Sequence, residues 1–250
     1  MELFLIRHAQ SYNNSLTDSS LRVEDPELTD LGHIQAGYLA DFIAAGTNRA
    51  PQRKTYVSTP DTHRGEGFGM TRLVCSPMWR ALQTAYYISE RTGLAPEVWP
   101  DIHEQGGIYL EQGAEGPVGL PGKSRTQILE GFPNVLLPET INDQGWWNNR
   151  EFETWEVCYR RAEQVVDHLF KLIESPERIA MISHGAFMDA LLKVLVKDVV
   201  LGITGDFEIP APMYFHHYNT GITHLRFGAS GAMDILYLNR VEHLPPEMIS

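Results

Sequence analysis

The sequence predicts an α/β protein: a three-layer α/β/α sandwich with a mostly parallel central sheet and antiparallel strands at its C-terminal end. Short apolar segments rich in β-forming residues alternate along the chain with longer segments whose apolar residues recur at helical spacing. This alternation is typical of a parallel sheet covered by helices on both faces. Near the C-terminus two apolar segments are instead joined by a Gly-Ala-Ser-Gly turn, which predicts a hairpin.

Each predicted strand is a short apolar segment bounded by polar or turn-forming residues. Glu2–Arg7 is a short apolar run bounded by polar residues and suits a buried strand. The strands predicted in chain order are Glu2–Arg7, Arg72–Cys75, Pro96–Trp99, Arg178–Ser183, Tyr214–Tyr218, Ile222–Phe227 and Ala232–Asn239.

The predicted helices have recognisable ends. Asp30 is a candidate N-cap for a helix that runs to about Ala45, and Ser76-Pro77 predicts an N-cap followed by the first helical residue of a helix that Gly93 ends. The strongest amphipathic pattern covers Glu151–Ile173. The other predicted helices are Gln127–Glu130 and Ala186–Val196.

We expect residues 1–250 to form a single domain with loop insertions at about 47–70 and 101–149. The chain shows no repeat, low-complexity tract or clear linker, and its length is sufficient for a substantial core. Both insertions are polar, contain glycine and exceed the usual length of a connection, so we expect lids or binding loops.

The composition excludes several classes of function. With 20 basic and 32 acidic residues the formal net charge is −12, which disfavours binding to nucleic acid or to an anionic membrane. No apolar run approaches the roughly 20 residues that span a bilayer, and the N-terminal sequence does not resemble a signal peptide. Cys75 and Cys158 are too few for a disulfide framework, and the histidines have no metal-ligand spacing. We therefore expect a cytoplasmic protein without a metal.

Polar residues follow four of the predicted strands at the point where each strand ends. These groups are Arg7-His8, Ser76 to Arg80, His103-Glu104 and Ser183-His184-Gly185. Because the carboxyl ends of parallel strands share one edge of an open α/β sheet, the topology would gather the histidines His8 and His184, the arginines Arg7 and Arg80, and the carboxylate of Glu104 there.

These residue types together indicate phosphoryl transfer. The planar guanidinium groups of Arg7 and Arg80 match phosphate oxygens, and a neutral imidazole is a competent nucleophile toward phosphorus. Neighbouring guanidiniums favour the neutral imidazole because they oppose further positive charge. Glu104 is the carboxyl group best placed to protonate the leaving alkoxide. With two arginines and a second histidine balancing the phosphate charge, the reaction needs no cofactor.

Five sequence motifs resemble the histidine phosphatase superfamily, which includes cofactor-dependent phosphoglycerate mutases and many phosphatases. They are LIRHAQSYNN, LTDLGHIQA, CSPMWRALQTA, a Glu shortly before Gly-Gly after the third strand, and ISHG, all in the family's order. The resemblance implies the phosphoglycerate mutase-like fold and a covalent phosphohistidine intermediate. The roles that it implies are nucleophile for His8, phosphate pocket for Arg7, Arg80 and His184, phosphate-side amide for Asn14, and proton donor for Glu104.

Departures from the family pattern favour hydrolysis over mutase activity. The family's Gly and acidic residue after the nucleophile are Ala9 and Gln10, and the mutase-type signature Glu-Arg-His-Tyr-Gly is replaced by Glu104-Gln-Gly-Gly-Ile-Tyr. The leading hypothesis is a metal-independent phosphomonoesterase whose partner is a small phosphorylated metabolite. The alternatives are a cofactor-dependent phosphoglycerate mutase and a non-catalytic sensor of a phosphate ligand. The sequence does not predict an oligomeric state.

Overall fold

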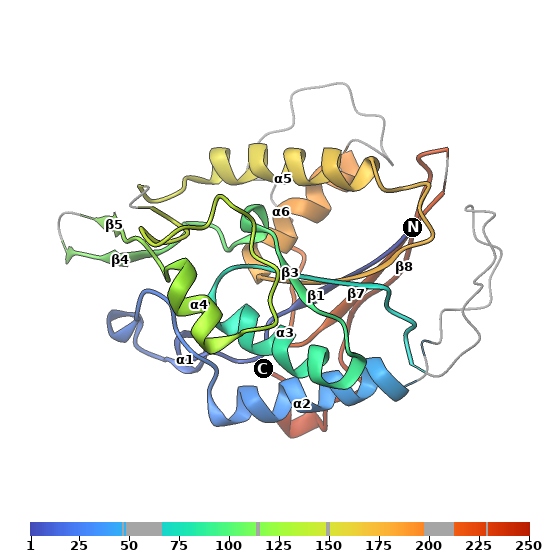
Figure 1. Cartoon of the computed structure of the whole chain (residues 1–250), viewed down its shortest axis with the longest axis horizontal. Helices are drawn as coiled ribbons and strands as arrows, with labels where there is room; N and C mark the ends of the chain where they lie inside the picture. The colour runs from blue at the N-terminus through green and yellow to red at the C-terminus, as the bar shows by residue number, and fades with distance from the viewer. Residues whose placement is uncertain (47, 49–66, 114–115, 149–150, 198–212, 229) are drawn as a thin grey trace.

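A computed structural model describes most of the chain (Figure 1). The described residues are 1–46, 48, 67–113, 116–148, 151–197, 213–228 and 230–250. Most of the insertion expected at about 47–70 therefore lies outside the described residues, and the expectation that it forms a lid stays a prediction.

The main sheet has six strands in the order β3-β2-β6-β1-β7-β8. β1, β2, β3 and β6 run parallel, whereas β7 is antiparallel to β1 and β8 is antiparallel to β7. These strands are β1 (Glu2–Arg7), β2 (Arg72–Cys75), β3 (Pro96–Val98), β6 (Arg178–Ser183), β7 (Ile222–Phe227) and β8 (Met233–Arg240). The predicted mostly parallel sheet with antiparallel C-terminal strands is confirmed.

Helices cover both faces of this sheet (Figure 1). Residues of α2, α3 and α4 share one hydrophobic cluster with Phe4 and Ile6, while α5 and α6 share another with Leu3 and Leu5. Because successive side chains of β1 point to opposite faces, one strand contributes to both layers of the core. The helices are α1 (Tyr12–Ser15), α2 (Asp30–Ala45), α3 (Trp79–Thr92), α4 (Arg125–Gly131), α5 (Trp155–Phe170) and α6 (Gly185–Leu195).

The insertion expected at about 101–149 contains regular structure. It holds a 3-10 turn, η2 (Pro100–Ile102), which separates Glu104 from the third strand, and the helix α4. It also holds a small antiparallel sheet of β4 (Tyr109–Glu111) and β5 (Pro117–Gly119). Two further 3-10 turns are η1 (Ser19–Leu21) and η5 (Pro246–Met248).

Two predicted helix starts are wrong. The N-cap of α2 is Thr29, whose Oγ1 accepts the Gly32 N–H at 3.0 Å, and Asp30 is the first helical residue. α3 begins at Trp79 with Met78 at the N-cap, so neither Ser76 nor Pro77 opens the helix. The Ser76 hydroxyl instead contacts the His184 ring. The predicted end at Gly93 is confirmed, because Gly93 adopts φ +73° at the C-cap.

The predicted long amphipathic helix is shorter than expected. Thr154 caps α5 by accepting the Val157 N–H, so Glu151 to Thr154 precede the helix, which ends at Phe170.

The predicted strand Tyr214–Tyr218 is not a strand, because side chains instead of a neighbouring strand satisfy its backbone. Asp189 Oδ1 accepts the Phe215 N–H at 2.8 Å, and Asn239 Oδ1 accepts the Tyr218 N–H at 2.8 Å. Among the described helices, none combines the length and hydropathy needed to cross a membrane.

Candidate active site

A polar pocket of about 240 Å³ opens at the carboxyl edge of the parallel strands. Four sequence-predicted site residues line it: His8, Asn14, Arg80 and Glu104. Its outer wall comes from the segment before α2 and the turn before β4, through Asn13, Arg22, Val23, Glu24, Pro26, Gln105, Gly107 and Tyr109. The other two predicted residues, Arg7 and His184, lie behind this lining.

The hydrogen bonds of His8 define its tautomer. A guanidinium only donates and a carbonyl only accepts. Arg80 Nε donates to His8 Nε2 at 3.1 Å, so Nε2 carries a lone pair. His8 Nδ1 lies 2.7 Å from the Ala9 carbonyl oxygen, so Nδ1 carries the proton. The buried ring is a neutral imidazole whose lone pair lies at Nε2, in the wall of the pocket.

The electrostatic surroundings keep both histidines neutral. Burial, followed by the charges of Arg80 and Arg7, lowers the pKa of His8 well below its usual value. Burial and then Arg80 lower the pKa of His184 in the same way. The two rings lie side by side with centroids 5.0 Å apart, so a proton on either would meet two guanidiniums and a second imidazole.

Ser76 positions His184. Ser76 Oγ lies 2.8 Å from His184 Nε2 and accepts the Met78 N–H at 3.2 Å. When the Ser76 hydroxyl donates to Nε2, the proton of the neutral ring stands on Nδ1. Nδ1 is buried and has no hydrogen-bond partner among the described residues. In that tautomer His184 offers an unused donor beside His8.

Protein groups bind one side of the Arg80 guanidinium group and one side of the Arg7 guanidinium group. Arg80 Nη1 lies 3.8 Å from Asp25 Oδ1, and Asp25 also accepts the Trp79 N–H at 3.0 Å. Burial raises the pKa of Asp25 to about 6, although the positive charge of Arg80 acts to lower it. Arg7 Nη1 donates to the His217 carbonyl at 2.7 Å, while its buried Nε has no partner in the described part of the chain.

Glu104 lies against the N-terminus of α6. Its Oε1 accepts the Phe187 N–H at 3.0 Å and the Gln105 N–H at 2.9 Å, and its Oε2 lies 3.4 Å from the Ala186 N. The following glycines, Gly106 and Gly107, have φ +95° and +73°. A Cβ on Gly107 would lie 2.3 Å from the Trp147 ring, so the Gly-Gly pair permits this turn.

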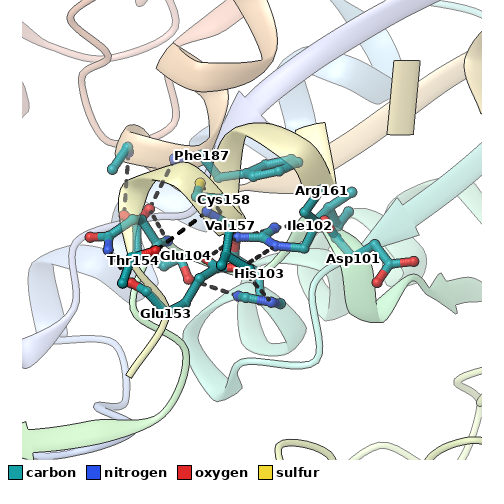
Figure 2. A network of polar contacts seen from close by, with 12 residues as sticks. Asp101, Ile102, His103, Glu104, Glu153, Thr154, Val157, Cys158, Arg161 and Phe187 are labelled. Atoms are coloured by element: carbon teal, nitrogen blue, oxygen red, sulfur yellow. Dashed lines mark hydrogen bonds and ion pairs between the residues drawn. The ribbon is translucent and has the colours of Figure 1, made fainter. Parts of the chain in front are cut away.

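A buried ion pair supports the segment that carries Glu104 (Figure 2). Arg161 of α5 binds both carboxylate oxygens of Glu153, at 2.8 and 2.6 Å. Its Nη1 also donates to the carbonyls of Asp101 at 2.7 Å and His103 at 3.1 Å. One guanidinium thus joins α5 to the backbone on either side of Ile102, immediately before Glu104.

Asn14 joins the site through its side-chain oxygen. Asn14 Oδ1 accepts the Ser11 N–H at 3.2 Å and lies 3.3 Å from Asn219 Nδ2. Asn219 Nδ2 also donates to the His8 carbonyl at 2.9 Å. Asn14 belongs to the pocket lining, and its side-chain oxygen is occupied by these contacts.

The LTDLGHIQA segment holds the loop that follows His8. Gln10 N–H donates to Gln35 Oε1 at 2.8 Å, and Thr29 N–H donates to the Gln10 carbonyl at 3.0 Å. A Cβ on Gly32 would lie 2.0 Å from that carbonyl oxygen, so only glycine permits the approach. Ala9 is not among the described residues with positive φ, so its methyl group costs no backbone strain.

The structure brings every sequence-predicted site residue to this edge, and it adds residues that sequence reasoning missed. These are Asp25, Thr84, Glu153, Arg161 and Asn219. Thr84 carried a recognisable signal, since it lies one helical turn after Arg80; its Oγ1 accepts the Ala9 N–H at 3.1 Å. Asn219 and Arg161 carried none, because each also binds backbone carbonyls far away in the chain, which the sequence does not mark. In the described ranges no three potential ligand side chains cluster as a metal site.

Buried histidines predict a loss of stability in acid. Burial, with Arg7 and Arg240 as the next causes, lowers the pKa of His217 and of His243 to about 4. The unfolded chain binds protons below its histidine pKa of about 6.5, whereas the folded protein does not until about pH 4. We expect each of the two to reduce the free energy of unfolding by about 1.4 kcal/mol per pH unit as the pH falls between those limits. Asp25, which keeps its proton up to about pH 6, opposes this trend.

Urea unfolding followed between pH 7 and pH 4.5 measures this dependence. His243→Gln keeps a side chain able to reach Thr220 but cannot titrate, so its stability should vary less steeply with pH than that of the wild type. His168→Gln, at an exposed position on α5, is the matched control. An unchanged slope in His243→Gln would contradict the assignment.

Fold and site together define an α/β protein with a polar pocket, lined by His8, Arg80 and Glu104, at the carboxyl edge of its sheet. The family model of the histidine phosphatase superfamily (branch 1) matches residues 62–239, and the chain belongs to this superfamily. The resemblance seen in the motifs is thereby confirmed, although the matched segment begins after His8.

Solved structures of three phosphatases share the fold. A putative α-ribazole-5′-P phosphatase from Escherichia coli has a TM-score of 0.60 at 16% identity, with 98% of this chain and 100% of that chain covered. The phosphoserine phosphatase of Entamoeba histolytica gives 0.54 at 20%, covering 98% and 99%. Mycobacterial glucosyl-3-phosphoglycerate phosphatase gives 0.52 at 18%, covering 95% and 98%. No curated protein sequence matches the chain.

Proposed function

We propose that this protein is a metal-independent phosphomonoesterase that hydrolyses small phosphate esters through a phosphohistidine on His8. The observation that carries the proposal is the neutral imidazole of His8, whose Nε2 lone pair lies in the pocket against Arg80. A lone pair at a pocket wall beside guanidiniums suits attack on a phosphoryl group.

The proposed reaction has two steps. First, His8 Nε2 attacks phosphorus, the P–O bond to the leaving group breaks, and Glu104 gives its proton to the departing alkoxide. Then water attacks the phosphohistidine, the P–N bond breaks, and the Glu104 carboxylate takes the proton of the water. Arg7, Arg80 and the Nδ1–H of His184 would share the charge of the transferring oxygens in both steps.

Two further observations support hydrolysis. The structural neighbours carry the names of phosphatases, and the sequence lacks the mutase-type signature after Glu104. A mutase must retain its phosphoryl group for return to a second substrate, whereas a hydrolase needs only access for water.

Phosphate release from a panel of phosphomonoesters in EDTA tests the proposal. We expect turnover of p-nitrophenyl phosphate and of small alkyl phosphates, together with a phosphoenzyme that is labile to acid and stable to base. Interconversion of 2- and 3-phosphoglycerate that requires bisphosphoglycerate and exceeds hydrolysis would identify a mutase instead. Tight ligand binding without phosphoenzyme or product would indicate a sensor.

A further inference from the structure

We infer that Arg22 makes this pocket selective for phosphate esters that carry a second anionic group. The inference rests on the proposed function, because it assumes that the phosphoryl group of the ligand occupies the His8 end of the pocket. Arg22 and Arg80 are the two arginines in the pocket lining, and they belong to different walls. Arg80 lies in the inner wall against His8, whereas Arg22 lies in the outer wall beside Val23 and Glu24.

The two arginines differ in what binds their guanidinium groups. Arg80 is buried and contacts both His8 and Asp25. Arg22 is exposed, and within the described part of the chain its guanidinium has neither an ion pair nor a hydrogen-bond partner. In a chain with twelve more acidic than basic residues, a cation with no carboxylate partner at the mouth of a pocket is available to a ligand.

The positive charge of Arg22 acts on Arg80 in the inner wall. Burial is the main cause that lowers the pKa of Arg80, Asp25 and Glu104 oppose this shift, and the positive charges of Arg22 and Arg7 add to it. Two guanidiniums close enough to repel each other favour an anion between or beside them. A phosphoryl group on Arg80 and a second anion on Arg22 would relieve this repulsion.

The backbone around Arg22 is fixed before any ligand binds. Asn13 Nδ2 donates to the Val23 carbonyl at 2.7 Å, and Val23 N–H donates back to Asn13 Oδ1 at 3.0 Å. On the other side, Asp18 caps the turn η1 by accepting the Ser20 N–H at 2.9 Å. Only the side chain of Arg22 has to be ordered when a ligand binds, which limits the entropic cost.

A carboxylate or a second phosphate would present the same chemistry to Arg22, since both accept two parallel N–H bonds from a guanidinium. Glu24, which lies in the same wall, adds a distinction. A ligand with an ammonium group next to its carboxylate could contact both Arg22 and Glu24. The second phosphate of a bisphosphate could contact Arg22, but Glu24 would repel it.

Matched substrates separate these cases. The pairs are 3-phosphoglycerate against glycerol 3-phosphate for a carboxylate, O-phosphoserine against O-phosphoethanolamine for a carboxylate beside an amine, and fructose 1,6-bisphosphate against fructose 6-phosphate for a second phosphate. The wild type should have the higher kcat/KM for the member with the second anion in at least one pair. Arg22→Gln should reduce that preference roughly 10- to 100-fold, mainly through KM, as expected for a charge-assisted hydrogen bond.

Two further variants complete the experiment. Arg22→Lys keeps the charge without the planar fork and should restore part of the preference. Arg160→Gln removes an exposed arginine that pairs with Glu156 on α5, and it should leave every preference at the wild-type value. An Arg22→Gln variant that keeps the wild-type preference in all three pairs would overturn the inference, as would equal losses for both members of each pair.

A binding measurement keeps this result independent of turnover. Calorimetric dissociation constants for the same six compounds compare wild type with Arg22→Gln without requiring hydrolysis. If no compound is hydrolysed but Arg22→Gln selectively weakens the doubly anionic ligands, the phosphatase proposal fails and the Arg22 inference stands. If hydrolysis proceeds without selective weakening, the inference fails and the phosphatase stands.

Discussion

His8→Ala should lower kcat/KM for every phosphomonoester by about 10⁴-fold or more, the scale seen when a covalent nucleophile is removed. The reason is specific to this site. The Nε2 lone pair lies in the pocket wall, where it accepts a hydrogen bond from Arg80 Nε, while the other ring nitrogen is committed to the Ala9 carbonyl. His184 lies outside the pocket lining and its Nε2 contacts Ser76, so we expect no phosphoryl transfer to that ring.

The decisive readout is the phosphoenzyme. Rapid acid-free quenching with a radiolabelled substrate should trap phosphate on wild type and none on His8→Ala. His168→Ala removes an exposed imidazole from α5 and should label like the wild type. Because alanine leaves Arg80 without the acceptor that it contacts here, a melting curve must accompany the measurement. Residual labelling of a folded His8→Ala protein would place the nucleophile elsewhere.

Glu104→Gln should slow the cleavage of alkyl phosphates about 10²- to 10⁴-fold, the usual contribution of a general acid. Glutamine preserves the shape of the side chain and a carbonyl oxygen for the Phe187 N–H, but it has no proton to transfer. An alkoxide requires that proton far more than p-nitrophenolate does, so the loss should be much smaller for p-nitrophenyl phosphate. Single-turnover rates for the two substrates measure the difference.

Glu111→Gln is the matched control, since Glu111 is an exposed glutamate on β4 outside the pocket lining. It should behave like the wild type with both substrates. If Glu104→Gln slowed both substrates equally, Glu104 would be holding the N-terminus of α6 in place without transferring a proton.

Much of the fold could be predicted because the residue pattern of each core strand is recognisable in the sequence. β1, β2, β6 and β7 are short segments rich in apolar and β-forming residues, and the structure gives them the predicted bounds. Helix starts were less predictable, because several residue types can cap the same end. Thr29 and Asp30 are both good caps, and only the position of the Gly32 N–H decides between them.

Some residues of the candidate site could likewise be predicted from the sequence, whereas others could not. Residues placed at strand ends, such as His8 and His184, could be assigned to one edge from topology alone. Ser76 was assigned the wrong contact, since a serine before proline predicts a helix cap in sequence, whereas here its hydroxyl meets His184 across the sheet edge. Asn219 and Arg161 bind backbone carbonyl groups. Every residue has such a group, so the sequence does not show which residue is the acceptor.

The pocket has two walls of different construction, and this affects how related enzymes can diverge. His8, Arg80 and Ser76 are buried among the strand ends and α3, where a change in volume would disturb the core. Arg22, Val23 and Glu24 are exposed in a segment anchored through its backbone. Substitutions in that segment alter the groups offered to a ligand at little cost to folding. A lineage with this architecture can therefore acquire new substrates while its chemistry stays constant.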